Sequence, residues 1–324
     1  YRPLPRPVSL HFVVDRLQRE QPFTEGSICS HCLRDVRNQN MRVGISCFLT
    51  DRSVNILDLA REAEAREFDD LWVPEHTHIP SGRQTDWPME EDSQLPEMYK
   101  RSLDPFVALS AAATVTERIT LGTSICLVAQ HDPIILAKTV STLDHLANGR
   151  LIFGVGFGWN AEEMLHHGVN PDRRRTIARE KVMAMKELWT QEEASFKGTY
   201  VNFEPSWQYP KPLQNPHPPI WVGGGKAALR HVVEWGDGWI PIEGVMPVPK
   251  LIQRMRSMAE EADRDPDEIS IYLAGAPEDP VRIDQYRQAG LHGLALGITW
   301  DGDLDTVRRE LDAHVEFRDR YLAG

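Results

Sequence analysis

The stretch PIWVGGGKAALRHVVEWGDGWIPI, residues 219–242, holds one complete strand–helix–strand unit. Its first apolar run, Pro219–Gly223, has the length of a strand and ends in three successive glycines. Lys226–Trp235 then places apolar side chains at helical spacing, and a second apolar run, Gly238–Ile242, follows at once. Because a helix that connects two strands usually leaves them parallel, this stretch predicts a βαβ unit in a parallel sheet.

The same alternation repeats along the chain from Met41 to the C-terminus. Eight apolar runs of strand length predict strands at Arg42–Phe48, Asp70–Val73, Ile119–Cys126, Arg150–Val155, Pro219–Gly223, Gly238–Ile242, Ile269–Leu273 and Gly293–Gly297. Amphipathic stretches between them predict helices at Val54–Glu67, Asp104–Thr116, Pro133–Ala147, Asp172–Thr190, Lys226–Trp235, Pro247–Asp263, Pro280–Ala289 and Asp303–Tyr321. Strand–helix units in this number close a barrel, so we expect residues 41–324 to form one α/β domain, a single (β/α)8 TIM barrel.

Two insertions interrupt this alternation. His76–Leu103 follows the second strand, on the side where barrel enzymes build their active sites, so we expect it to form a lid. Gln191–Pro218 precedes the fifth strand and contains Ala194–Val201, which predicts a small hairpin on the opposite side of the barrel.

Residues 1–40 lack the alternation and carry more basic than acidic side chains, whereas the rest of the chain is strongly acidic. We therefore interpret them as an N-terminal extension that is not part of the barrel. Cys29 and Cys32 form a CxxC that could be half of a zinc site, but no second pair at metal-ligand spacing follows. Cys47 and Cys126 fall inside predicted strands as core thiols, so we expect no metal site.

The composition argues against several classes of partner. A formal net charge of -12 does not suit a nucleic-acid surface, which needs clustered Lys and Arg. No apolar run approaches the roughly 20 residues that span a bilayer, and the N-terminus lacks the apolar core of a secretory signal. We expect a cytoplasmic protein whose partner is a small-molecule substrate.

In a barrel, residues just past the carboxyl end of a strand face the active site. Glu75 and His76 follow the second predicted strand, and the imidazole of His76 can exchange a proton near neutral pH. The alternative for His76 is a histidine that caps the end of a strand. His131 stands just before a predicted helix and is either a site residue or part of that helix start.

Gly223, Gly224 and Gly225 follow the fifth predicted strand, where backbone N–H groups can approach a phosphate at a helix N-terminus. The alternative is a tight strand-to-helix turn, because neither a Walker motif nor a GxGxxG pattern is present. Arg173–Arg175 lie at the start of a predicted helix, whose positive end repels them. Either they bind an anion or they form a solvated basic run.

Six motifs follow one another along the chain: ITLGTSI at 119–125, HxPxxxAK at 131–138, LDxLxxGR at 143–150, GVGFGW at 154–159, PIWVGGG at 219–225 and GDGW at 236–239. In this order and at this spacing they resemble the luciferase-like monooxygenases, most closely the coenzyme F420-dependent oxidoreductase branch. The resemblance covers Met41 to the C-terminus and leaves out residues 1–40.

The resemblance implies roles for individual residues. In the F420 branch, the third strand carries a bulge with a non-prolyl cis peptide behind the deazaflavin ring, and Ser124 and Ile125 occupy that place. Glu75 and His76 match an acid–histidine pair beside the reacting face of the ring, in which Glu75 would orient His76.

Further positions match the part of the site that holds the cofactor. Gly156, Gly158 and the three glycines at 223–225 match residues that line its phosphate-bearing tail. Trp159 departs from the F420-dependent sugar-phosphate dehydrogenases, which carry a catalytic glutamate there, and this makes sugar-phosphate oxidation doubtful. A tryptophan can instead stack against the ring or a flat apolar substrate.

The leading hypothesis is an oxidoreductase that transfers a hydride between coenzyme F420 and a small organic substrate, with His76 exchanging the proton. The alternative cofactor is FMN, which with oxygen would make the protein a monooxygenase. A second alternative is a flavin-binding barrel without turnover. Barrels of this superfamily are usually dimers, so we expect a homodimer.

Overall fold

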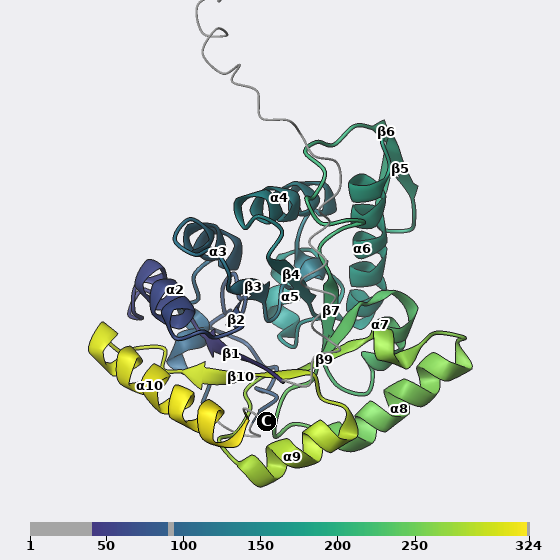
Figure 1. The fold of residues 1–324 in the computed structure, drawn as a ribbon. Coiled ribbons are helices and arrows are strands. Elements are labelled where there is room, and N and C mark those ends of the chain that lie inside the picture. The colour runs from purple at the N-terminus through teal and green to yellow at the C-terminus, as the bar shows by residue number, and fades with distance from the viewer. Residues whose placement is uncertain (1–40, 90–93, 323–324) are drawn as a thin grey trace, which may run out of the picture.

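Eight parallel strands close a barrel in the computed structural model, which describes residues 41–89 and 94–322 (Figure 1). The strands follow the order β1-β10-β9-β8-β7-β4-β3-β2. Their bounds are β1 Arg42–Cys47, β2 Asp70–Val73, β3 Thr120–Thr123, β4 Leu151–Val155, β7 Ile220–Gly223, β8 Gly238–Ile240, β9 Ser270–Leu273 and β10 Gly293–Ile298. The TIM barrel predicted from the alternation is confirmed. The predicted N-terminal extension, with Cys29 and Cys32, lies outside the described residues.

Helices surround the barrel, and each of those predicted is present, Pro280–Ala289 at its predicted bounds and the others with one or both ends moved by a few residues (Figure 1). They are α2 Ile56–Ala65, α3 Pro105–Ala113, α4 Pro133–Leu146, α6 Arg174–Thr190, α7 Leu229–Trp235, α8 Val248–Glu261, α9 Pro280–Ala289 and α10 Leu304–Tyr321. Asp104 and Asp132 cap α3 and α4 through their carboxylates, and a first-turn proline follows each cap. A further short helix, α5 Ala161–His166, was not predicted.

The barrel closes where its first strand meets its last. β1 pairs with β10 in parallel from Arg42 opposite Gly293 to Cys47 opposite Ile298. In Figure 1 this is the junction of the purple and yellow-green strands, with α10 packed beside α2. Closure leaves the barrel sheet without a free edge.

Successive side chains of each strand point alternately outward and inward. On β2, Leu71 and Val73 join the layer between strands and helices, whereas Trp72 points into the barrel. There it stacks on Trp221 at 5.5 Å between ring centroids and lies 5.0 Å from the ring of Tyr272. These aromatic rings fill the interior, so the barrel is a packed core with its site at one end.

The two insertions take the positions expected of them. Residues 194–206 form an antiparallel hairpin, β5 Ala194–Lys197 and β6 Asn202–Ser206, between the end of α6 and the start of β7. The insertion after β2 supplies Pro88, Met89, Met98 and Tyr99 to the cavity described below. Among the described residues, no helix has both the length and the apolar composition to span a bilayer.

Candidate active site

A cavity of about 520 Å³ lies at the carboxyl ends of the barrel strands and has mainly apolar walls. Most of the site residues expected from the sequence line it: Glu75, His76, Ser124, Ile125, Gly158, Trp159, Gly223, Gly224 and Gly225. Arg174 and Arg175 at the start of α6 line it as well. The structure therefore brings residues from β2, β3, β4 and β7 to one cavity.

Glu75 and His76 are neighbours in sequence but bind different partners. His76 Nδ1 lies 2.9 Å from Glu163 Oε2, whereas Glu75 Oε1 lies 2.8 Å from His131 Nε2. The prediction that Glu75 orients His76 is therefore wrong. Consecutive residues of an extended chain point to opposite sides, which sends one side chain toward α5 and the other toward the start of α4.

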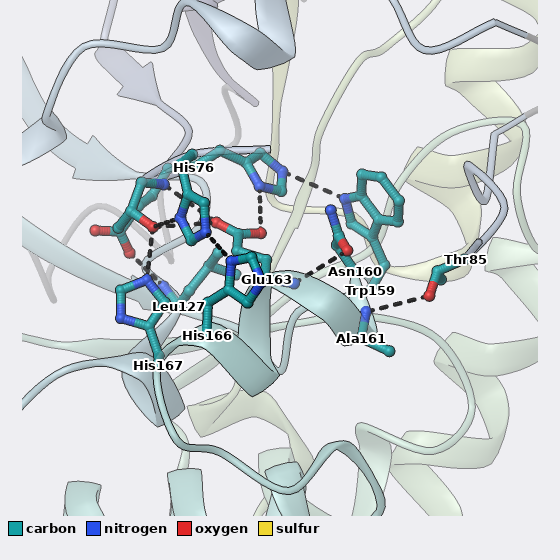
Figure 2. A network of polar contacts seen from close by, with 12 residues as sticks. His76, Thr85, Leu127, Trp159, Asn160, Ala161, Glu163, His166 and His167 are labelled. Carbon is teal, nitrogen blue, oxygen red and sulfur yellow. Dashed lines mark hydrogen bonds and ion pairs between the residues drawn. The ribbon is translucent and has the colours of Figure 1, made fainter. Parts of the chain in front are cut away.

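The contacts of His76 define which ring nitrogen carries its proton. Trp159 Nε1 lies 3.3 Å from His76 Nε2, and because an indole N–H only donates, Nε2 must accept. In the neutral ring, Nδ1 then carries the proton and donates it to Glu163 (Figure 2). His76 therefore keeps its basic nitrogen on the side of Trp159, which lines the cavity.

Glu163 was missed by sequence reasoning because α5, the helix that carries it, has only six residues. Asn160 caps this helix, and its side chain accepts the Glu163 N–H at 3.2 Å. An Asn followed three residues later by Glu is a helix-start pattern that could have revealed it. Glu163 is 1% exposed and also accepts the Thr77 N–H at 3.1 Å, so the buried carboxylate is well supplied with donors.

In the second acid–histidine pair, Glu75 with His131, both carboxylate oxygens have hydrogen-bond partners within the protein. Burial raises the pKa of Glu75, but hydrogen bonds from His131 and the Leu127 N–H outweigh it and hold this pKa below its usual value. Burial lowers the pKa of His131, but Glu75 outweighs burial and leaves that pKa raised. Burial raises the pKa of the Cys126 thiol well above its usual value, and Glu75 adds to this effect.

Glu75, Cys126 and His131 also place their ligand atoms within 4.8 Å of one another. A metal would need the thiolate of Cys126, which its surroundings disfavour, and the oxygens of Glu75 already accept hydrogen bonds. This chemistry favours a hydrogen-bonded network over a metal site.

Ile125 is held between two glycines. The peptide bond between Ser124 and Ile125 is cis, as the resemblance implies. A Cβ on Gly156 would lie 1.6 Å from Ile125 Cδ1, and a Cβ on Gly223 would lie 2.8 Å from Ile125 Cγ2. Gly156 does not line the cavity, so its predicted contact with the cofactor is corrected: the missing side chain makes room for Ile125.

At least one of the three backbone N–H groups at 223–225 that were predicted to bind a phosphate is already hydrogen-bonded within the protein. Gly224 has φ of +124°, which favours glycine, but its N–H donates to the Ile240 carbonyl at 3.2 Å. α7 also begins at Leu229, three residues later than predicted, so its N-terminus lies further from the glycines. The prediction that all three N–H groups face a phosphate is therefore wrong for Gly224.

Arg174 and Arg175 supply positive charge to the wall of the same cavity. Arg174 Nε is buried without a hydrogen-bond partner among the described residues, and burial, then the neighbouring Arg175, lower the Arg174 pKa. Burial lowers the pKa of His231 on α7 to about 4, and Arg175 is one of the cations that add to this shift. A half-buried guanidinium with a buried, unpaired Nε suits an anionic group of a ligand. Arg173 does not line the cavity.

Residues 36–277 match the model of the luciferase-like monooxygenase family. The chain belongs to this family. An uncharacterized protein of Mycobacterium tuberculosis is 43% identical over 263 residues, which are 80% of this chain and 92% of that protein. The F420-dependent glucose-6-phosphate dehydrogenase of Kineococcus radiotolerans is 30% identical over 192 residues, 58% of this luciferase-like chain and 52% of that enzyme.

Solved structures share the fold of this luciferase-like protein. The monooxygenase RslO1 from Streptomyces bottropensis matches with a TM-score of 0.73 and 22% identity, over 87% of this chain and 100% of that one. An F420-dependent secondary alcohol dehydrogenase in complex with an F420–acetone adduct matches with a TM-score of 0.67 and 20% identity, over 86% and 98%. At these identities the matches establish the barrel fold alone.

Proposed function

We propose that this protein transfers a hydride between coenzyme F420 and a small neutral organic substrate, and that His76 exchanges the accompanying proton. The observation that carries this proposal is the position of His76, whose Nε2 accepts the Trp159 N–H at the cavity wall while its Nδ1 lies 2.9 Å from the Glu163 carboxylate. A histidine held between a reacting site and a buried carboxylate suits general acid–base chemistry.

The cavity fits a cofactor with an anionic tail. Arg174 and Arg175 line the same cavity as the glycine loop after β7, and two strands, β4 and β3, separate that loop from the β2 end that carries His76. A bound deazaflavin would supply the two-electron centre of the reaction. F420-dependent relatives at 27–30% identity support F420, whereas the family description and the fold of RslO1 make reduced FMN with oxygen the alternative.

The walls near His76 suit a neutral substrate. Phe48, Met98, Tyr99 and Trp159 line the cavity, and the Tyr99 and Trp159 rings lie 5.1 and 5.7 Å from the imidazole. Arg174 and Arg175 are the cations among the described lining residues, and they serve the cofactor tail in this proposal. The resemblance implies that Trp159 stands where the sugar-phosphate dehydrogenases carry a glutamate, which supports a small alcohol or carbonyl compound over a sugar phosphate as the substrate.

Absorbance titration of the purified apoprotein with F420 and with FMN tests the cofactor assignment. We expect saturable spectral changes with F420 at lower concentrations than with FMN. Binding of FMN in preference to F420 would move the protein to the monooxygenase alternative. Binding of neither would leave no redox function for the cavity.

We also propose that the protein is a homodimer. Val107 on α3 and Ile135 on α4 are 71% and 69% exposed, and Trp207, beside the segment bonded to α4, is 74% exposed. Apolar side chains gathered on adjacent helices are typical of an interface. Light scattering should give a dimer that Ile135→Glu dissociates and that Val281→Glu, an equally exposed position on α9, leaves intact. A monomeric wild type would contradict this proposal.

A further inference from the structure

A continuous line of polar groups runs from His76 to the protein surface (Figure 2). His76 and Glu163 are 8% and 1% exposed, so the line begins among buried groups. Thr77 comes next and is exposed, as are His166 and His167 at the end of α5. The side of the imidazole that faces away from Trp159 is therefore connected to solvent through protein groups.

Each contact in this line is within hydrogen-bonding reach. Thr77 Oγ1 lies 3.4 Å from Glu163 Oε1 and 2.7 Å from His167 Nε2. The same hydroxyl lies 3.0 Å from His78 Nδ1, and His78 Nε2 lies 2.9 Å from His166 Nδ1. The hydroxyl of Thr77 thus joins the buried pair to His167 and His78, and His78 continues the line to His166.

We propose that Glu163, Thr77 and His167, with His78 and His166 as a second branch, form a proton relay between His76 and solvent. The relay deepens the proposed function, since its catalytic use rests on His76 as the acid–base group. Its existence is a property of the protein without cofactor, so it can be tested separately.

The proton balance needs no further reactant. When the substrate takes the place of the Trp159 N–H and His76 Nε2 accepts a proton from it, the Nδ1 proton passes to Glu163 Oε2. Rotation of the carboxyl group brings that proton to Thr77 Oγ1, whose own proton passes to His167 Nε2. His167 then releases one proton to water, and the reverse sequence delivers one. No electrons move along the relay.

The surroundings suit a relay better than a purely structural network. Burial, then the neighbouring His78, lower the pKa of His167, which favours the neutral ring that can accept a proton. Burial raises the pKa of Tyr99, which keeps its phenol protonated, and Glu75 is occupied by His131 and Leu127. With cofactor and substrate in the cavity, the Glu163 side of His76 is the open route for its proton.

Hydrogen exchange of the His76 ring tests the relay in the apoprotein. In protein with ¹⁵N-labelled histidine, NMR measures how fast the His76 Nδ1 proton exchanges with water. Thr77→Val removes the hydroxyl while keeping the side-chain shape, and we expect it to slow this exchange by about tenfold or more. Thr85→Val is the matched control, because Thr85 bonds Glu162 and the start of α5 but lies outside the line.

The result decides in either direction. Slower exchange in Thr77→Val with an unchanged rate in Thr85→Val supports the relay. Equal rates in wild type and Thr77→Val, or equal slowing in both variants, would overturn it. Should Thr77→Val not fold, the surface double variant His78→Asn/His167→Asn should slow exchange in the same way, and added imidazole should restore it. An unaltered rate in that variant would also overturn the relay.

Turnover separates this proposal from the proposed function. If F420 does not bind and exchange of the His76 Nδ1 proton still slows in Thr77→Val, the relay is supported and the proposed function is contradicted. If F420 turnover depends on His76 while Thr77→Val changes neither proton exchange nor turnover, the proposed function is supported and the relay is contradicted.

Discussion

The site contains two acid–histidine pairs that start from adjacent residues and differ in what surrounds them. In the pair of Glu75 with His131, one carboxylate oxygen accepts the Leu127 N–H at 2.6 Å and the other lies 2.8 Å from His131 Nε2. Both oxygens of Glu75 therefore have partners within the protein. In the pair of His76 with Glu163, the imidazole touches Trp159 at the cavity and the carboxylate touches Thr77 toward the surface. We therefore expect the pair of Glu75 with His131 to stabilise the fold and the pair of His76 with Glu163 to act in acid–base chemistry.

The largest expected difference between the pairs is in turnover. Glu163→Gln keeps a hydrogen bond to His76 but cannot balance the charge of a protonated ring, so we expect kcat to fall by about 100-fold. Glu75→Gln should lower stability while kcat changes by less than about threefold. Steady-state kinetics and unfolding curves of both variants check this difference. Equal losses of kcat would contradict the assignment of different roles to the two pairs.

The pair of Glu75 with His131 should instead control stability, with a defined pH dependence. We expect His131→Asn to cost about 2 kcal/mol of unfolding free energy, since it leaves the buried Glu75 carboxylate without its cation. The His131 pKa is raised on folding, so its contribution is full below the unfolded pKa of about 6.5 and is lost as pH rises through the folded value. The Glu75 pKa is lowered, so its contribution is present above about 4.3 and is lost at more acidic pH.

Urea unfolding of wild type and His131→Asn at about pH 6 and about pH 9 measures this dependence. The difference between the two proteins should be larger at the lower pH. A difference that grows toward alkaline pH would mean that His131 acts in its neutral form.

A variant in the part of the cavity proposed to hold the cofactor tail tests the cofactor site separately from the two acid–histidine pairs. Gly224→Val would strain a positive φ as well as the site, so Arg174→Met is the cleaner change. We expect it to weaken F420 binding about tenfold, because a charged hydrogen bond is lost, with little effect on unfolding. Arg173→Met, an exposed neighbour that does not line the cavity, should bind F420 as wild type does. Equal affinities in the two variants would remove Arg174 from the cofactor site.

The smallest effect is expected from removal of residues 1–40. Because β1 begins at Arg42 and pairs along its whole length with β10, removal of residues 1–40 should leave the thermal unfolding transition cooperative and near its original midpoint. Calorimetry of the truncated protein checks this. A broadened or lost transition would show that the extension contributes to the core.

The sequence was sufficient for the barrel because each strand and helix carries its own local pattern, as in residues 219–242. It also placed His76 and Trp159 at the cavity, since position after a strand determines which end of the barrel a residue occupies. It could not pair His76 with Glu163, which is 87 positions away on a helix too short to show periodicity. It misjudged Gly156 for a similar reason: only the fold shows that Ile125 fills the space beside that glycine.

Single-turnover kinetics of His76→Ala tests the central claim most directly. The F420-loaded protein would be mixed with the best substrate from a panel of neutral alcohols and carbonyl compounds, and cofactor absorbance would be followed in a stopped-flow instrument. We predict that F420 affinity is kept, because Arg174 and the glycine loop are untouched, while hydride transfer slows by about 100-fold or more. A transfer rate equal to that of wild type would contradict the account and leave His76 with a binding role alone.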